Sequence, residues 1–135
     1  MNTKKWLIAA LGVFIAYFAM EFVVHGVIMK PLYEQTASVW RPEEYMRKLM
    51  LWMMAGQAIF SVMFVLIYAK GYDASKPGPA QGARYGLLIG LLTAPMGALV
   101  WYAILPIPET IPVYWFVSGL VESVVIGAVA GALYR

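Results

Sequence analysis

Residues 6–29 read WLIAALGVFIAYFAMEFVVHGVIM, and this long apolar run decides the fold class. As an α-helix it would extend for about 36 Å at about 1.5 Å per residue, which exceeds the roughly 30 Å hydrocarbon core of a bilayer. Two lysines precede it, as in a signal peptide, but the run continues well past the length of a signal-peptide core. We therefore expect a retained membrane-spanning helix.

Three further runs have the same character, over residues 49–69, 83–105 and 114–134. The chain is 62% hydrophobic and 13% charged, against roughly 45–50% and 25% in ordinary soluble domains. A chain of 135 residues cannot hide that much apolar surface in its own core. Lipid favours helices or closed barrels, and these runs are too continuous for barrel strands. The sequence predicts one domain over residues 1–135, an all-α integral membrane four-helix bundle with short connections.

The connections are short and differ in composition. In RPEE (41–44), a proline followed by two carboxylates is typical of a helix start, so the second helix is expected to extend back to about Pro42. Residues 106–113, PIPETIPV, hold three prolines, which predicts a stiff and extended link.

Basic residues are distributed unequally between the two sides. Four spans place both termini and the second connection on one side, with basic residues at positions 4, 5, 70, 76, 84 and 135. The other side has basic residues at positions 30, 41, 47 and 48. Because lysine and arginine are enriched in cytoplasmic loops, both termini are expected in the cytoplasm. No basic cluster is long enough to indicate nucleic acid, so the expected partner is the lipid bilayer.

Small residues recur at every fourth position in the last two runs and form what we call the small-residue ridges. They are Gly82, Gly86, Gly90 and Ala94 in the third run, and Gly119, Ser123, Gly127 and Gly131 in the fourth. Residues four apart lie on one helix face, and small ones let two helices approach closely in lipid. The ridges either pack on each other within one chain or form the face of a homodimer, and the sequence leaves both alternatives open.

Polar side chains interrupt three of the four runs at nearly one depth. Glu21, Gln57 and Glu122 each lie about 12–13 Å from the outer end of their helix. Tyr17, Glu21 and His25 are spaced by four and share a helix face. Acids at this depth are costly and usually face the interior of a bundle. We expect Glu21 to meet His25 and Glu122, with at least one of the two acids protonated at neutral pH.

This polar layer has three interpretations. The acids can be a structural tether, hydrogen-bonded to Gln57, Ser118 or Tyr102. They can form a ligand-binding or proton-linked site. Glu21, His25 and Glu122 are also candidate metal ligands, although three donors fall short of the four carboxylates and two histidines of a di-iron bundle.

Signals for catalysis are absent from the sequence. The chain has no cysteine, and it contains no GxSxG, HExxH, P-loop or dinucleotide-binding motif. The sequence therefore names no catalytic residue and no cofactor.

Several segments carry a resemblance to a class of membrane proteins. HGVIMKPLYEQTASVWRPEEYM (25–46), YAKGYD (68–73) with GARYGLLIGLL (82–92), and VESVVIGAVAGALYR (121–135) resemble small bacterial four-helix membrane proteins of unknown function. The resemblance implies the bacterial inner membrane and four helices, and no chemistry. The leading functional hypothesis is a small membrane binding or accessory protein that assembles through its small-residue ridges, as a homodimer or in a larger complex. The alternatives are a proton-coupled carrier or permeation element using Glu21 and Glu122, and a metal-dependent membrane protein.

Overall fold

The computed structural model describes residues 2–135, and within that range every regular element is a helix. Four helices are long and apolar enough to cross a membrane: Thr3–Ile28, Met50–Lys70, Gly78–Ile104 and Thr110–Leu133. The elements in chain order are α1 (Thr3–Val23), a π-helical turn (Val24–Ile28), α2 (Lys30–Gln35), a 3-10 turn (Ala37–Val39), α3 (Glu43–Lys48), α4 (Met50–Lys70), α5 (Gly78–Pro95), a second π-helical turn (Met96–Val100), α6 (Trp101–Ile104) and α7 (Thr110–Leu133).

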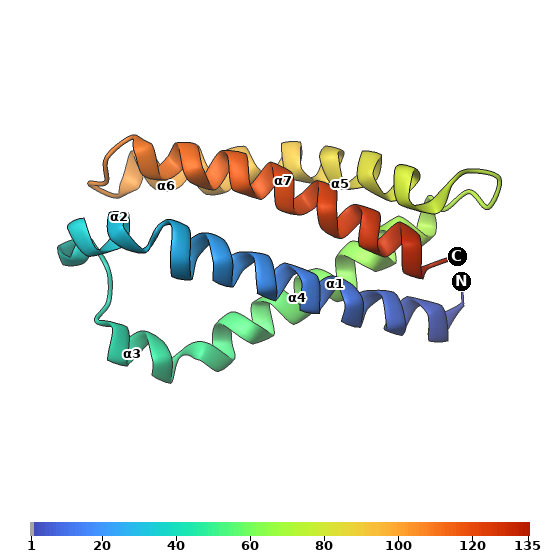
Figure 1. Ribbon diagram of the computed structural model, residues 1–135, viewed down its shortest axis with the longest axis horizontal. Coiled ribbons are helices and arrows are strands. Elements are labelled where there is room, and N and C mark those ends of the chain that lie inside the picture. The colour runs from blue at the N-terminus through green and yellow to red at the C-terminus, as the bar shows by residue number, and fades with distance from the viewer. Residues whose placement is uncertain (1) are drawn as a thin grey trace.

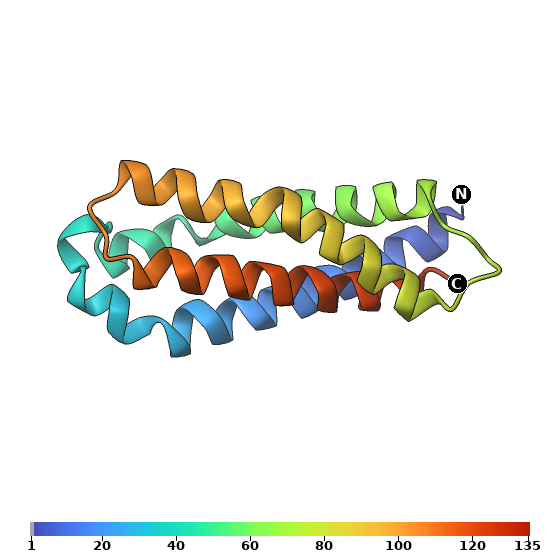
Figure 2. The same cartoon turned by 90° about the horizontal axis from the view of Figure 1, so that it is seen from above.

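The four long helices run up and down beside one another (Figures 1 and 2). Both termini lie at the same end of the molecule as the connection between α4 and α5. The short helices α2 and α3 gather at the opposite end with the link from α6 to α7. The common end for the two termini follows from the even number of long helices.

The helix starts differ from the sequence-based boundaries in three places. The expected continuous helix from Pro42 is wrong, because α3 ends at Lys48 and a turn at Leu49 (φ −95°, ψ 5°) separates it from α4. Helix α3 is charged and exposed, with an Arg47–Glu43 ion pair of 3.3 Å, whereas α4 is apolar. The two helices therefore suit different environments, and Figure 1 shows them taking different directions.

The third and fourth long helices begin earlier than their apolar runs do. Helix α5 starts at Gly78, with Pro79 in its first turn. The extended link predicted over residues 106–113 is wrong in its second half, because α7 starts at Thr110 and includes Pro112. Proline is tolerated in a first turn, where its missing N–H has no helical partner to lose.

The small-residue ridges of α5 and α7 pack directly on each other. A Cβ added to Gly82 would overlap the backbone carbonyl of Gly127, and one added to Gly86 would overlap that of Ser123. Further along the contact, a Cβ on Gly119 would lie 3.3 Å from that of Ala94. The structure therefore shows packing within one chain, which covers both ridges. Of the two alternatives that the sequence left open, the structure thus shows the packing of the ridges on each other.

The outer surface of the bundle is strongly apolar. At most 33% of the residues in each spanning window are buried inside the protein. Side chains such as Leu51, Trp52 and Leu92 stay 70% or more exposed. The fold itself therefore leaves the apolar faces of these helices uncovered, as is typical of helices that cross a membrane.

Two separate apolar cores lie at the two ends of the bundle. The larger core, at the end of the termini, consists of Ala9, Ala10, Val13, Phe64, Val65, Tyr68, Ile126, Ala130 and Tyr134. The smaller core consists of Met29, Ile107 and Ile111, with Trp40 and Trp115 packed against it. Glu21 on α1 and Glu122 on α7 lie between these two cores. The region between the two apolar cores is therefore left for a polar site.

Candidate functional site

A cleft of about 610 Å³ lies between α1 on one side and α5, α6 and α7 on the other. Three kinds of residue make up most of its lining. The aromatic ones are Tyr17, Trp40, Phe60, Trp101 and Trp115; the polar ones are Glu21, His25, Thr93, Ser118, Glu122 and Ser123; the small ones are Ala94, Gly97, Ala98 and Gly119. No lysine or arginine is among the described residues that line it.

Two acids from the first and last helices meet in this cleft. The carboxyls of Glu21 and Glu122 both line the cleft and lie close enough to interact electrostatically. The Tyr17 side chain lines the cleft beside the same two carboxyls. Glu122 is only 4% exposed, and among residues 2–135 its Oε1 has no hydrogen-bond partner. A buried polar atom without a partner is costly, so this oxygen marks the part of the cleft that the protein itself leaves unsatisfied.

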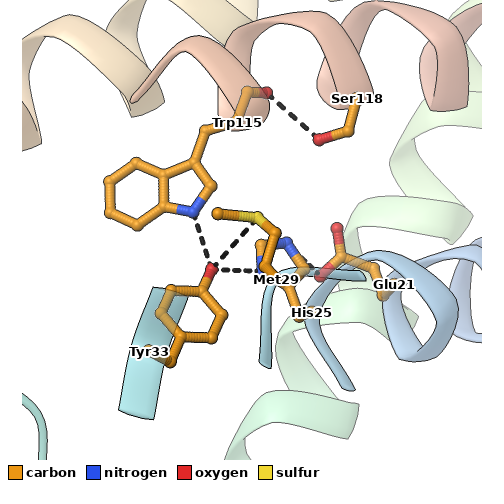
Figure 3. A network of polar contacts seen from close by, with 6 residues as sticks. All are labelled: Glu21, His25, Met29, Tyr33, Trp115 and Ser118. Atoms are coloured by element: carbon orange, nitrogen blue, oxygen red, sulfur yellow. Dashed lines mark hydrogen bonds and ion pairs between the residues drawn. The ribbon is translucent and has the colours of Figure 1, made fainter. Parts of the chain in front are cut away.

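A chain of polar contacts leads from Glu21 toward the end of the bundle opposite the termini (Figure 3). His25 Nε2 lies 3.5 Å from Glu21 Oε2, and His25 Nδ1 lies 2.5 Å from the Tyr33 hydroxyl. The indole N–H of Trp115 donates to the same hydroxyl at 2.8 Å, and Met29 Sδ lies 3.5 Å from it. The Tyr33 hydroxyl is thus the junction of three side chains, those of His25, Met29 and Trp115.

This junction can accommodate two protonation states of His25. When the imidazole is neutral, Tyr33 donates to Nδ1 and the Nε2–H group points toward Glu21. When the imidazole is cationic, Nδ1–H donates to Tyr33, and the hydroxyl proton turns toward the sulfur of Met29. Burial raises the pKa of Tyr33 to about 12, although the bond from Trp115 acts in the other direction. Tyr33 therefore keeps its proton throughout the physiological range and remains a donor in the neutral-imidazole state.

The two π-helical turns place several of these groups. The first is closed by the bond from Met29 N–H to the Val24 carbonyl, 2.8 Å long, and carries His25. The second follows Pro95, whose missing N–H interrupts the helical ladder, and it carries Gly97 and Ala98. Such turns widen a helix locally and are frequent at functional sites. Here each turn lies along the cleft.

Gln57 does not line the cleft, although the sequence places it at the same depth as the acids. Its backbone carbonyl accepts the Ser61 hydroxyl at 2.7 Å. Helix α4 diverges from α1 and α7 as it approaches α3 (Figure 1). Its contribution to the cleft is Phe60, whose ring packs 5.3 Å from that of Tyr17. The expected Glu21–Gln57–Glu122 layer is thus incomplete, with Glu21 and Glu122 adjacent and Gln57 outside.

The tether partners suggested by the sequence are also placed elsewhere. The Ser118 hydroxyl donates to the Trp115 carbonyl at 3.4 Å, and Tyr102 is 43% exposed.

Five aromatic residues of the site were not predicted from the sequence: Tyr33, Trp40, Phe60, Trp101 and Trp115. Tyr33 and Trp40 lie in the connection between α1 and α3. This connection, which contains α2 and the 3-10 turn, folds back over the cleft. A partial signal exists in the sequence, because Trp115, Ser118 and Glu122 are spaced by three and four and share a face of α7. The position of Tyr33 depends on a reversal of the chain that no local pattern indicates.

The residues do not gather into a metal site. Within residues 2–135, no three His, Asp or Glu side chains come close enough together to hold a metal ion. The candidate set Glu21, His25 and Glu122 therefore does not fit a three-ligand centre.

Comparison of the chain with protein-family models, with curated protein sequences and with solved structures gave no match.

Proposed function

We propose that this chain is a small multi-pass membrane protein that binds a small ligand in the cleft between α1, α5, α6 and α7. The observation that carries this proposal is Glu122. It is 4% exposed, it lines the cleft, and its Oε1 is without a partner in the described part of the chain. A purely structural acid would be expected to have its hydrogen bonds satisfied within the fold.

The size and access of the cleft support a ligand site. Its volume of about 610 Å³ lies in the range of about 300–1,000 Å³ that small-molecule sites occupy. Thr93 of α5, Gly97 of the second π-helical turn and Trp101 of α6 line it and remain exposed on the surface. A ligand can therefore enter at the level of the membrane interior without the helices separating.

We place the protein in the bacterial inner membrane with both termini in the cytoplasm, on the resemblance and the charge difference described above. A homodimer or a larger membrane complex remains a prediction. Because the small-residue ridges are covered within the chain, such an assembly would use the outer apolar faces of α1, α4 or α5.

The test is a ligand screen with the purified protein and two tryptophan variants. A Cβ added to Gly97 meets open space in the cleft, and one added to Gly56, on α4 away from the cleft, also meets no described atom within 4 Å. Gly97→Trp should fill the cleft, whereas Gly56→Trp is the matched control. We expect compounds that raise the melting temperature of the wild type and of Gly56→Trp but have no effect on Gly97→Trp. A screen of anionic, neutral and cationic compounds in which none separates the two variants would contradict the proposal.

The second candidate is a proton-coupled carrier, which the contact chain from Glu21 through His25 to Tyr33 favours. This chain joins the half-buried Glu21 to Tyr33 of α2, at the end of the bundle opposite the termini, and provides a route for a proton. In proteoliposomes, a carrier predicts ligand uptake that depends on a pH gradient and is lost in Glu122→Gln. Ligand binding without any uptake would leave the binding protein as the function.

A further inference from the structure

The residues that line the cleft favour a cationic ligand over an anionic one. It contains two carboxyls, from Glu21 and Glu122, and none of its described residues is a lysine or an arginine. The titratable groups that face the acids are Tyr17 and His25, both from the first spanning segment. Helices α4, α5 and α6 present only uncharged residues to the cleft. An anionic ligand in the cleft would therefore lie beside two acids, and no lysine or arginine would attract it there.

The aromatic residues strengthen the same preference. Trp40 and Trp115 lie with their ring centroids 6.2 Å apart at an interplanar angle of 68°, and both rings border the cleft. Trp101 and Tyr17 add two further rings. The face of an aromatic ring attracts a cation, and tryptophan does so most strongly. Acids and rings together thus provide a cation site with apolar walls.

We propose, on the basis of the proposed ligand site, that the cleft takes a hydrophobic organic cation in exchange for a proton held by Glu21 and Glu122. The positive group lies against the two carboxyls, where the unpartnered Glu122 Oε1 gains an opposite charge. The apolar body of the ligand lies among the tryptophans and the small residues of α5. One proton leaves the acid pair for each cation that enters, so the charge of the cleft does not change.

The access route agrees with such a ligand. A hydrophobic cation concentrates at the membrane interface, and the exposed Thr93, Gly97 and Trp101 open the cleft on the surface of the spanning helices. A small inorganic cation would need a ring of oxygen ligands, and within residues 2–135 the acidic and histidine side chains do not cluster in that way.

The test compares two probes of the same shape and opposite charge, tetraphenylphosphonium and tetraphenylborate. Equilibrium dialysis is carried out on the detergent-solubilised protein, with protein-free micelles as the baseline. We expect tetraphenylphosphonium to bind at least about tenfold more tightly than tetraphenylborate. Its binding should weaken by up to about tenfold per pH unit on acidification, since a proton competes for the same acids.

Four variants locate this binding. Glu122→Gln and Gly97→Trp should each weaken the binding of tetraphenylphosphonium at least about tenfold. Gly56→Trp and Glu34→Gln, which alter an open position on α4 and an exposed acid on α2, should leave it unchanged. Circular dichroism and gel filtration on every variant separate a loss of binding from a loss of fold.

Two outcomes would overturn the cation proposal, and they differ in what they leave standing. If both probes bind equally and Gly97→Trp abolishes both, the cleft is a ligand site without charge selection, and the proposed function survives. If tetraphenylphosphonium does not bind above the micelle baseline, the cation proposal fails. The ligand screen with Gly97→Trp and Gly56→Trp then decides the proposed function independently.

Discussion

The third spanning helix, Gly78–Ile104, contains glycines in two different surroundings, and the contrast separates the structural part of this protein from its candidate site. At Gly86 an added Cβ would overlap the backbone carbonyl of Ser123, so the glycine is required for the contact between α5 and α7. At Gly97, in the π-helical turn that follows α5, an added Cβ would meet open space in the cleft. Small residues therefore give close packing along one part of the contact and leave room along the other.

The largest effect is expected from adding a single methyl group at the close contact. Gly86→Ala forces the backbones of α5 and α7 apart, because a carbonyl cannot rotate away as a side chain can. We expect a loss of about 3 kcal/mol or more in the free energy of unfolding, measured by titration with SDS from a mild detergent.

Gly56→Ala is the matched control, since an added Cβ there meets nothing within 4 Å and alanine favours the helix. Equal stability for Gly86→Ala and Gly56→Ala would show that the two helices do not approach as closely as described.

The next largest effect on the free energy of unfolding is expected at Tyr33, in the connection between α1 and α3 that closes over the cleft. Tyr33→Phe removes the hydroxyl that His25 and Trp115 share, and it leaves the Trp115 N–H without its acceptor. A loss of about 1–3 kcal/mol follows from unpaired buried polar groups. Tyr114→Phe, at a position 45% exposed, is the control and should change stability by less than about 0.5 kcal/mol. The SDS titration that measures Gly86→Ala applies here too, and equal stabilities for the two variants would rule out the junction.

A smaller effect, of opposite sign, separates a ligand site from a tether. Glu122→Leu removes a buried acid with an unpartnered oxygen, so it should leave stability unchanged or raise it by about 1 kcal/mol. If Glu122 serves instead to hold α1 to α7, the same variant should lose more than about 2 kcal/mol. The melting temperature of the detergent-solubilised variant, compared with that of the wild type, decides between a ligand-site role and a tether role for Glu122.

The smallest effect concerns the turn between α4 and α5. The hydroxyl of Ser75, with its backbone N–H and then Lys76, lowers the pKa of Asp73 from 3.8 to about 2. A lowered pKa in the folded state means that the ionised acid stabilises the turn above pH 3.8. That contribution is lost as the pH falls toward 2. Asp73→Asn should therefore reduce the change in stability between pH 5 and pH 2. Identical acid profiles for the variant and the wild type would contradict this.

The sequence predicted the four long helices because their apolar runs carry the signal locally. It also placed Glu21, Gln57 and Glu122 at nearly one depth, from helix rise alone. It could not predict that α4 diverges from the bundle, so it gave Gln57 a place that Phe60 occupies. It also missed Tyr33, which reaches the site only because the chain turns back at α2. Depth along a helix follows from residue counting, whereas the direction in which a face points depends on tertiary packing.

The central claim is that carboxyls from α1 and α7 share a proton in the cleft. Infrared spectroscopy of the reconstituted protein in heavy water tests it directly. We expect the carbonyl absorption of a neutral carboxylic acid at neutral pH in the wild type and in Glu34→Gln, and its loss in Glu122→Gln. A wild-type spectrum at neutral pH with no neutral carboxyl would contradict the claim.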